Sequence, residues 1–247
     1  MSRTKKIFAN LICCLIPLKK LRRRARNFLL LPFGARNYII SLGHACFAAG
    51  GIAKSGGRRF SGPFDWCWGS SCNKKLEIIF NKFAHFFDKR DFDHIGIDPN
   101  NHYQIYHNTN TDIFYNHDFG PDSDFNTEYP IVFDKYTRRI DRVMKILNKR
   151  RARVLLVYGE RVDGPMNFDL HQLTKIMEKL NKKYPAQIRL LYIKHNLENN
   201  DESVIRDNQY IFTTNYIHNV YSPQTDPFIE ELIAKMIKSY YELYDRH

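Results

Sequence analysis

Residues 154–158 read Val-Leu-Leu-Val-Tyr, an unbroken apolar run in a chain of 247 residues. A strand that is covered on both faces has this pattern. The sequence then predicts a helix from Asp169 to Lys183 and a second apolar strand over residues 188–193. Strand, helix and strand at this spacing indicate a right-handed crossover between parallel strands.

The alternation of strands and helices extends on both sides of this unit. We expect a strand at 38–42, another near 210–220 and a closing helix over 227–244. The pattern predicts an α/β fold of three layers, in which helices flank a mostly parallel sheet. Ligands of such sheets bind beyond the carboxyl ends of the strands.

The middle of the chain gives weaker signals. Apolar spacing predicts packing helices over 74–87 and 134–149, and the Gly-Pro pair in 59–66 predicts a loop. Residues 98–128 are rich in Asn, Asp, His and Tyr, which suits exposed strands or a long functional loop.

The net charge of +12 is concentrated at the start of the chain. Nine of the 38 basic residues and none of the 26 acidic ones lie in 1–30, so the rest of the chain is nearly neutral. The five cysteines are too few and too irregularly spaced for a disulfide framework, and no C-x-x-C pair suggests zinc. We expect a reducing compartment and neither a metal nor a cofactor.

Residues 7–18 are nearly all apolar but too short to cross a bilayer, which takes about twenty helical residues. The basic run after them opposes export. We therefore expect 1–34 to be a basic helix and linker that binds the inner face of the cytoplasmic membrane, and 35–247 to be one α/β domain. The membrane-binding residues would be Lys5, Lys6, Lys19, Lys20, Arg22, Arg23 and Arg24.

Two alternatives exist for this N-terminal segment. Its apolar side could dock on the body of the protein, or it could be a nucleic-acid arm. It lacks the interleaved aromatic residues of such an arm, so we expect no nucleic-acid partner. Residues 11–24 also resemble the N-terminal leaders of many bacterial enzymes that build capsule and lipopolysaccharide, which implies a role connected with surface polysaccharide.

The strand at 38–42 ends in Gly43, and Cys46 follows three residues later. Where a strand gives way to a helix, unpaired N–H groups and the helix dipole favour a thiolate. This position predicts a nucleophilic cysteine, with Gly43 and His44 beside the substrate. The alternative is that Cys46 is a small buried apolar residue.

Five blocks of the sequence stand out in order along the chain, at residues 41–46, 61–66, 117–119, 135–142 and 154–157. Together they resemble a bacterial family of unknown function described as papain-like cysteine peptidases. The resemblance implies a thiol nucleophile at Cys46 and a histidine base at His117. Two papain signatures are missing, because Phe47 replaces the usual Trp and Ile40 stands where the oxyanion Gln would be.

A second resemblance is to SGNH-type esterases and acyltransferases, whose sheet has a flavodoxin-like arrangement rather than the α+β fold of papain. These enzymes also have a nucleophile three residues after a strand-ending glycine. Their base comes late, just before the final helix, where His218 stands here. Their usual Asp-x-x-His spacing is altered, because Asn215 replaces the aspartate.

Asp65 lies between two aromatic residues and could orient a base or cap the next helix. Asp118 adjoins His117, but neighbours on a strand point to opposite faces, so Asp118 cannot orient that ring. We place Asp118 among the substrate-contacting residues.

Four further residues complete the predicted site. Arg58 and Arg59 form a basic turn that could hold a phosphate or carboxylate. Glu160 and Arg161 follow a strand and should face the crevice at the edge of the sheet. The sequence thus predicts a thiol-dependent hydrolase or acyl transferase acting on a glycan, peptide or acyl substrate. The alternative is a non-catalytic, nucleotide-sugar-binding or glycosyltransferase-like protein of a surface-glycan assembly system.

Overall fold

The computed structural model of the chain divides into two compact units, residues 1–37 and 38–247. In the first unit, helix α1 spans Arg3–Cys14. Among the described residues, no helix combines the length and the apolar character that crossing a membrane requires. The residues that the structure describes are 3–18, 21–22, 25, 29, 32–43, 46–99, 101–160, 168–195, 203–216 and 226–244.

The larger unit is built on a five-stranded sheet in the order β1-β6-β7-β9-β8. β6 pairs in parallel with β7, and β7 in parallel with β9, while β8 is an antiparallel edge strand. The crossover predicted from residues 154–193 is therefore confirmed. The strands are β1 (Asn37–Ser41), β6 (Arg153–Gly159), β7 (Gln187–His195), β8 (Ile205–Arg206) and β9 (Ile211–Tyr216).

β1 lies beside β6 and runs in the same direction. The Leu42 amide donates to the Val157 carbonyl at 2.9 Å, and the Lys149 amine lies 3.3 Å from the Tyr38 hydroxyl. The Leu42–Val157 bond places the carboxyl end of β1 beside the carboxyl end of β6. An antiparallel β1 would run past the end of β6, so the two strands are parallel. The carboxyl ends of β1, β6, β7 and β9 thus share one edge of the sheet, which we call the carboxyl edge.

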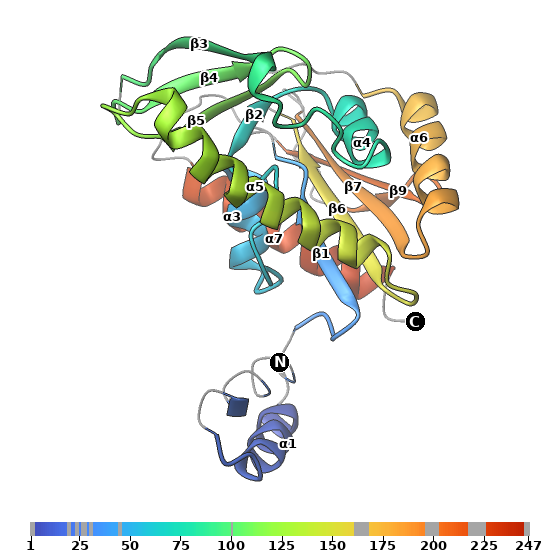
Figure 1. Cartoon of the computed structure of the whole chain (residues 1–247). Coiled ribbons are helices and arrows are strands. Elements are labelled where there is room, and N and C mark those ends of the chain that lie inside the picture. Colours follow the sequence, from blue (N-terminus) through green and yellow to red (C-terminus); the bar gives the residue numbers. More distant parts are fainter. Residues whose placement is uncertain are drawn as a thin grey trace. The chain divides into compact units, whose positions relative to one another are not determined.

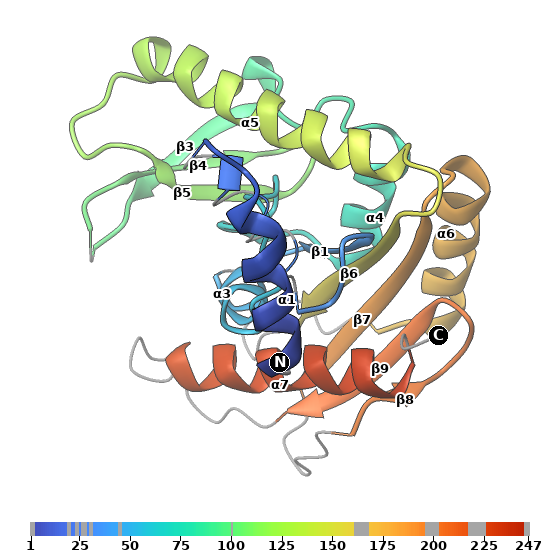
Figure 2. The same ribbon diagram turned by 90° about the horizontal axis from the view of Figure 1, so that it is seen from below.

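Helices cover both faces of this sheet (Figure 1; Figure 2). α3 (Phe47–Lys54) packs against α7 (Asp226–Leu243) on one side, and α4 (Cys72–Phe80) lies beside α6 (Leu170–Lys183) on the other. The predicted three-layer α/β class is confirmed, including a helix at the N-terminus.

A second sheet, which is antiparallel, has the order β2-β5-β4-β3. The helix α5 (Phe125–Leu147) packs on it, and a cluster of aromatic side chains that includes Phe87, Tyr115 and Tyr136 fills its core. The region 98–128 is thus partly strand, as predicted. The strands are β2 (Cys67–Gly69), β3 (Phe92–Ile97), β4 (Gln104–Asn108) and β5 (Ile113–Phe119).

Two predicted helix boundaries are wrong. The helix expected over 74–87 ends at Phe80, because Lys82 and Phe83 adopt left-handed backbone conformations with φ of 56° and 61°. The helix expected from 134 begins at Phe125. The Asp124 carboxylate caps it by accepting from the Thr127 amide at 2.8 Å, and the helix continues through Pro130.

Candidate active site

The turn at the end of β1 depends on Gly43. Its φ is +72°, a conformation that L side chains rarely adopt, and its amide donates to Ser41 Oγ at 2.8 Å. A Cβ atom at this position would lie 2.5 Å from the Phe64 carbonyl oxygen and 3.1 Å from that of Cys67. The loop 61–66 therefore packs directly against the turn that leads to Cys46.

Cys46 is the N-cap residue of α3, and its carbonyl accepts from the Gly50 amide at 2.8 Å. The thiol therefore lies at the positive end of a helix, just after the carboxyl end of β1. Its side chain is half-buried. α3 itself packs tightly, since a Cβ on Gly51 would lie 2.4 Å from the Ile233 side chain of α7.

Cys67 and Cys72 are buried thiols, as expected of packed cysteines. Burial raises the pKa of Cys67 to about 12 and raises that of Cys72 further. A thiol with so high a pKa is protonated at neutral pH and is a poor nucleophile. Of these three cysteines, Cys46 is the accessible one.

Glu160 lies at the carboxyl edge, directly after β6, as the sequence predicts. Its carboxylate is buried and accepts from the Tyr192 hydroxyl at 2.6 Å and from the His195 amide at 2.9 Å. Burial and this hydrogen bond raise the pKa of Tyr192. The contacts fix the Glu160 carboxylate against β7, whereas Arg161 lies outside the described residues.

The Asp65 carboxylate holds the loop 61–66 together by hydrogen bonds. Its Oδ2 accepts from the Gly62 amide at 2.9 Å and from Arg58 Nη2 at 2.7 Å. Burial raises the pKa of Asp65, while the Gly62 amide and the Arg58 guanidinium oppose that shift. Arg59 turns elsewhere and lies over the Tyr38 ring at 4.3 Å. The basic turn is thus largely occupied in holding this loop and β1.

His117 and Asp118 belong to β5 in the antiparallel sheet. The Asp118 carboxylate accepts from the Tyr136 hydroxyl at 2.7 Å and from the Lys135 amine. The Asp118 side chain is buried by these partners, whereas His117 is exposed. Their different environments agree with the expectation that Asp118 does not orient His117.

His117 and His218 are the two histidines that the sequence predicts as the base. His218 lies outside the described residues, as does His44 beside Cys46. The assignment of either histidine to the Cys46 thiol stays a prediction.

Sequence reasoning missed Lys75, Tyr192 and His195. Lys75 lies in α4 and is completely buried, on the same helical face as Cys72 and Ile79. The spacing of Lys75 from these two apolar residues was the signal in the sequence that could have indicated its burial. Tyr192 and His195 belong to the second apolar strand, so the carboxyl-edge rule that selected Glu160 could also have selected His195.

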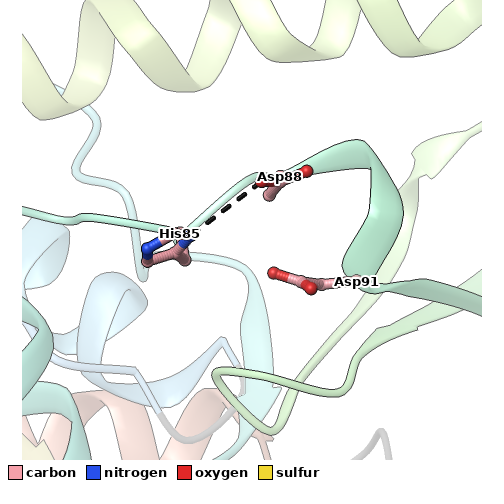
Figure 3. A group of neighbouring side chains, drawn as sticks. All are labelled: His85, Asp88 and Asp91. Carbon is pink, nitrogen blue, oxygen red and sulfur yellow. Dashed lines mark ion pairs between the residues drawn. The ribbon is translucent and has the colours of Figure 1, made fainter.

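A cavity of about 580 Å³ lies between residues 82–89 and α5. His85, Asp88 and Asp91 lie near it, with potential metal-binding atoms within 4.8 Å of one another (Figure 3). Both oxygens of Asp88 already bind the Arg90 guanidinium, which lowers the pKa of that carboxyl. A cation would have to compete with this guanidinium, so we assign no metal there. The aromatic lining of the cavity comes from Phe83, Phe86, Phe87, Tyr129 and Phe133.

The fold and the position of Cys46 define an α/β protein with an accessible cysteine at the helix start that follows the first strand of a mostly parallel sheet. The chain belongs to the family described as "Putative papain-like cysteine peptidase", which matches residues 37–198. Comparison with curated proteins and with solved structures gives no significant match. The likeness to SGNH-type enzymes stays a prediction.

Proposed function

We propose that the protein is a thiol-dependent hydrolase or acyl transferase whose nucleophile is Cys46. The observation that carries this proposal is the position of a half-buried thiol at the N-terminus of α3, on the carboxyl edge of the sheet. The helix dipole stabilises a thiolate there. Membership of the peptidase-like family supports the same chemistry.

The reaction begins when the Cys46 thiolate attacks a carbonyl carbon of the substrate. The resulting tetrahedral intermediate expels the amine or alcohol, which takes up the proton that the base had removed from the Cys46 thiol, and a thioester remains on Cys46. Water or a sugar hydroxyl then attacks the thioester and loses its proton to the base. The acyl group leaves with the acceptor, and the thiol is restored. Donors at the start of α3 would stabilise both oxyanions.

The acceptor decides between hydrolysis and acyl transfer. The leader-like character of residues 11–24 favours a precursor of a bacterial surface polysaccharide as the substrate. Acylation or deacylation of such a glycan fits a thiol nucleophile as well as peptide cleavage does. The competing proposal is a nucleotide-sugar-binding protein that uses the same edge of the sheet without chemistry.

The test uses p-nitrophenyl acetate as an acyl donor with the full chain. We expect a rapid release of about one equivalent of nitrophenolate and an intact mass increased by one acetyl group, located on Cys46 by peptide mapping. Cys46→Ala should abolish both, and Cys72→Ala, which removes a buried thiol, should abolish neither. Equal acetylation of Cys46→Ala and of the native chain would exclude Cys46 as the nucleophile and favour the binding protein.

We also propose that α1 holds the protein on an anionic membrane surface. Ile7, Phe8 and Leu11 are more than half exposed on this helix, at 53%, 63% and 64%. Exposed apolar residues next to a basic run suit the interface of an anionic bilayer. Lys19, Lys20, Arg23 and Arg24 of that run lie outside the described residues.

Flotation tests the membrane proposal. Vesicles of phosphatidylglycerol and phosphatidylcholine should carry the full chain upward in a density gradient, and vesicles of phosphatidylcholine alone should carry much less. A variant with Ile7, Phe8 and Leu11 replaced by Ser keeps every charge and should lose flotation. Equal flotation of this variant and the native chain would contradict the proposal.

A further inference from the structure

The start of α4 holds two buried polar side chains, Lys75 and Ser70. Lys75 is 0% exposed and Ser70 is 1% exposed. Within the described part of the chain, neither Lys75 Nζ nor Ser70 Oγ has a hydrogen-bond partner. Buried polar groups are almost always satisfied in proteins, so two such groups near one helix terminus need an explanation.

Both groups belong to the N-terminal end of α4. Ser70 precedes the N-cap residue Ser71, whose Oγ accepts from the Lys74 amide at 3.3 Å. Helical side chains point back toward the N-terminus, and the Lys75 amine lies within electrostatic reach of Cys72 one turn earlier. The amine also lies 5.4 Å from the centre of the Tyr158 ring of β6. These contacts direct the amine to the helix terminus, over the carboxyl end of β6.

Among the residues that the structure describes, the Lys75 charge has no close counterion. The titratable groups that act on it are Cys67 of β2, Cys72 of α4 and Asp112 in the turn before β5. Both thiols are protonated at neutral pH because burial raises their pKa. Asp112 is half-exposed and lies 3.1 Å from His107 Nε2. Burial lowers the pKa of Lys75 to about 8, so the ammonium form still predominates at neutral pH.

We propose that the N-terminal end of α4 is a binding site for an anionic group, a carboxylate or a phosphate. Lys75 Nζ and Ser70 Oγ would donate to it, and the helix dipole would add to the attraction. Buried ammonium groups are stabilised by a hydrogen-bonded anion, which the described residues do not supply here. Because both atoms are buried, the anion enters through a local opening of the fold, and association is slow.

This site extends the proposed function by naming a class of substrate. β6 neighbours β1, whose end leads to Cys46, so the anion site and the thiol lie on the same edge of the sheet. The assignment of the anion to the substrate of Cys46 rests on the proposed function. The substrate would then be an acidic acyl compound or an acidic or phosphorylated glycan.

The experiment measures the thermal midpoint of the full chain in sodium phosphate and in sodium acetate, against sodium chloride at equal ionic strength. We expect a saturable increase with at least one of the two anions at about pH 7, and a smaller increase at about pH 9, where Lys75 is largely neutral. Lys75→Met should weaken the apparent affinity at least tenfold. Lys74→Met, which changes the adjacent lysine of the same helix, should leave it unchanged.

A second measurement does not depend on the folding of any variant. The Lys75 side-chain resonance of lysine-labelled native protein gives its pKa, which should rise when the effective anion is added. An unchanged Lys75 pKa, or equal anion responses of Lys75→Met and Lys74→Met, would overturn the site. Cys46→Ala should retain the full anion response, so a failed thiol proposal and a failed anion site give different results.

Discussion

Gly43 and Phe64 meet so closely that a Cβ atom on Gly43 would lie 2.5 Å from the Phe64 carbonyl oxygen. This contact joins the turn after β1 to the loop 61–66. Both segments lie within residues 37–198, which the family model matches. The loop supports the turn from which the chain continues to Cys46.

Gly43→Ala should destabilise the protein and disturb Cys46. The left-handed φ alone costs about 1–3 kcal/mol for a non-glycine residue, and the clash with backbone atoms adds to it. Urea unfolding measures the loss, and iodoacetamide labelling should show slower alkylation of Cys46. Gly159→Ala is the matched control, because a Cβ there meets nothing within 4 Å. Equal stability of the two variants would contradict the role given to Gly43.

Asp65→Asn separates support of the loop from a role in catalysis. The change removes the ion pair with Arg58, and we expect a loss of roughly 1–3 kcal/mol in the free energy of unfolding. The rate of Cys46 alkylation should stay within about twofold of the native rate. Asp122→Asn, at an exposed position, should change neither quantity. A large fall in alkylation at unchanged stability would instead make Asp65 a residue that orients the base.

Tyr136→Phe tests the buried network below β5. The Tyr136 hydroxyl donates to Asp118 at 2.7 Å and lies 3.3 Å from Cys67 Sγ. Its removal leaves a buried carboxylate short of a donor, which costs about 1–3 kcal/mol. Tyr184→Phe removes a hydroxyl that donates to the neutral Ile79 carbonyl at 2.9 Å, so it should cost less. The reverse order in urea unfolding would contradict the importance of this network.

Lys75 should make stability depend on pH in a specific window. The folded pKa, about 8, is below the usual 10.5, so between these values the unfolded chain binds more protons than the folded one. The free energy of unfolding therefore rises with pH across this window, and Lys75 contributes on the order of 3 kcal/mol to the increase. Lys75→Met should abolish this increase and raise stability at neutral pH.

The measurement compares urea unfolding of Lys75→Met and Lys74→Met across the same pH range. The comparison isolates Lys75, because the buried tyrosines with raised pKa values are common to both variants. Parallel stability curves for the two variants would show that Lys75 titrates normally in the folded state.

Local sequence patterns predicted the parallel half of the fold well. Residues 154–193 carry their own signals, an apolar run, a capped helix and a second apolar run, and the structure follows them. The helix end at Phe80 could not be predicted in this way. Phe83 and Phe87 keep helical spacing, but they are buried in an aromatic cluster with residues far away in sequence. Tertiary packing overrides propensity in such segments.

The positions of two candidate residues were predictable from the strands. Cys46 was selected by its place after a strand-ending glycine and Glu160 by its place directly after a strand. The structure places them after β1 and β6, the neighbouring strands. Lys75 was not recognised as a buried charge, because lysine is almost never fully buried. Its spacing from Cys72 and Ile79 was the only local signal that it lies on a packed helical face. Its burial depends on β2 and β6, which approach α4 only in the folded chain.

The rate of Cys46 alkylation by iodoacetamide at about pH 6.5 tests whether this thiol is activated. Peptide mass spectrometry follows Cys46 in the folded chain and in the same chain unfolded in urea, with the exposed Cys14 as a second reference. An ordinary thiol is about 1% ionised at that pH. We expect Cys46 to react at least tenfold faster in the folded chain than in the unfolded one. A folded-state rate equal to or below the unfolded rate would show that Cys46 is a packed thiol and that the proposed chemistry is wrong.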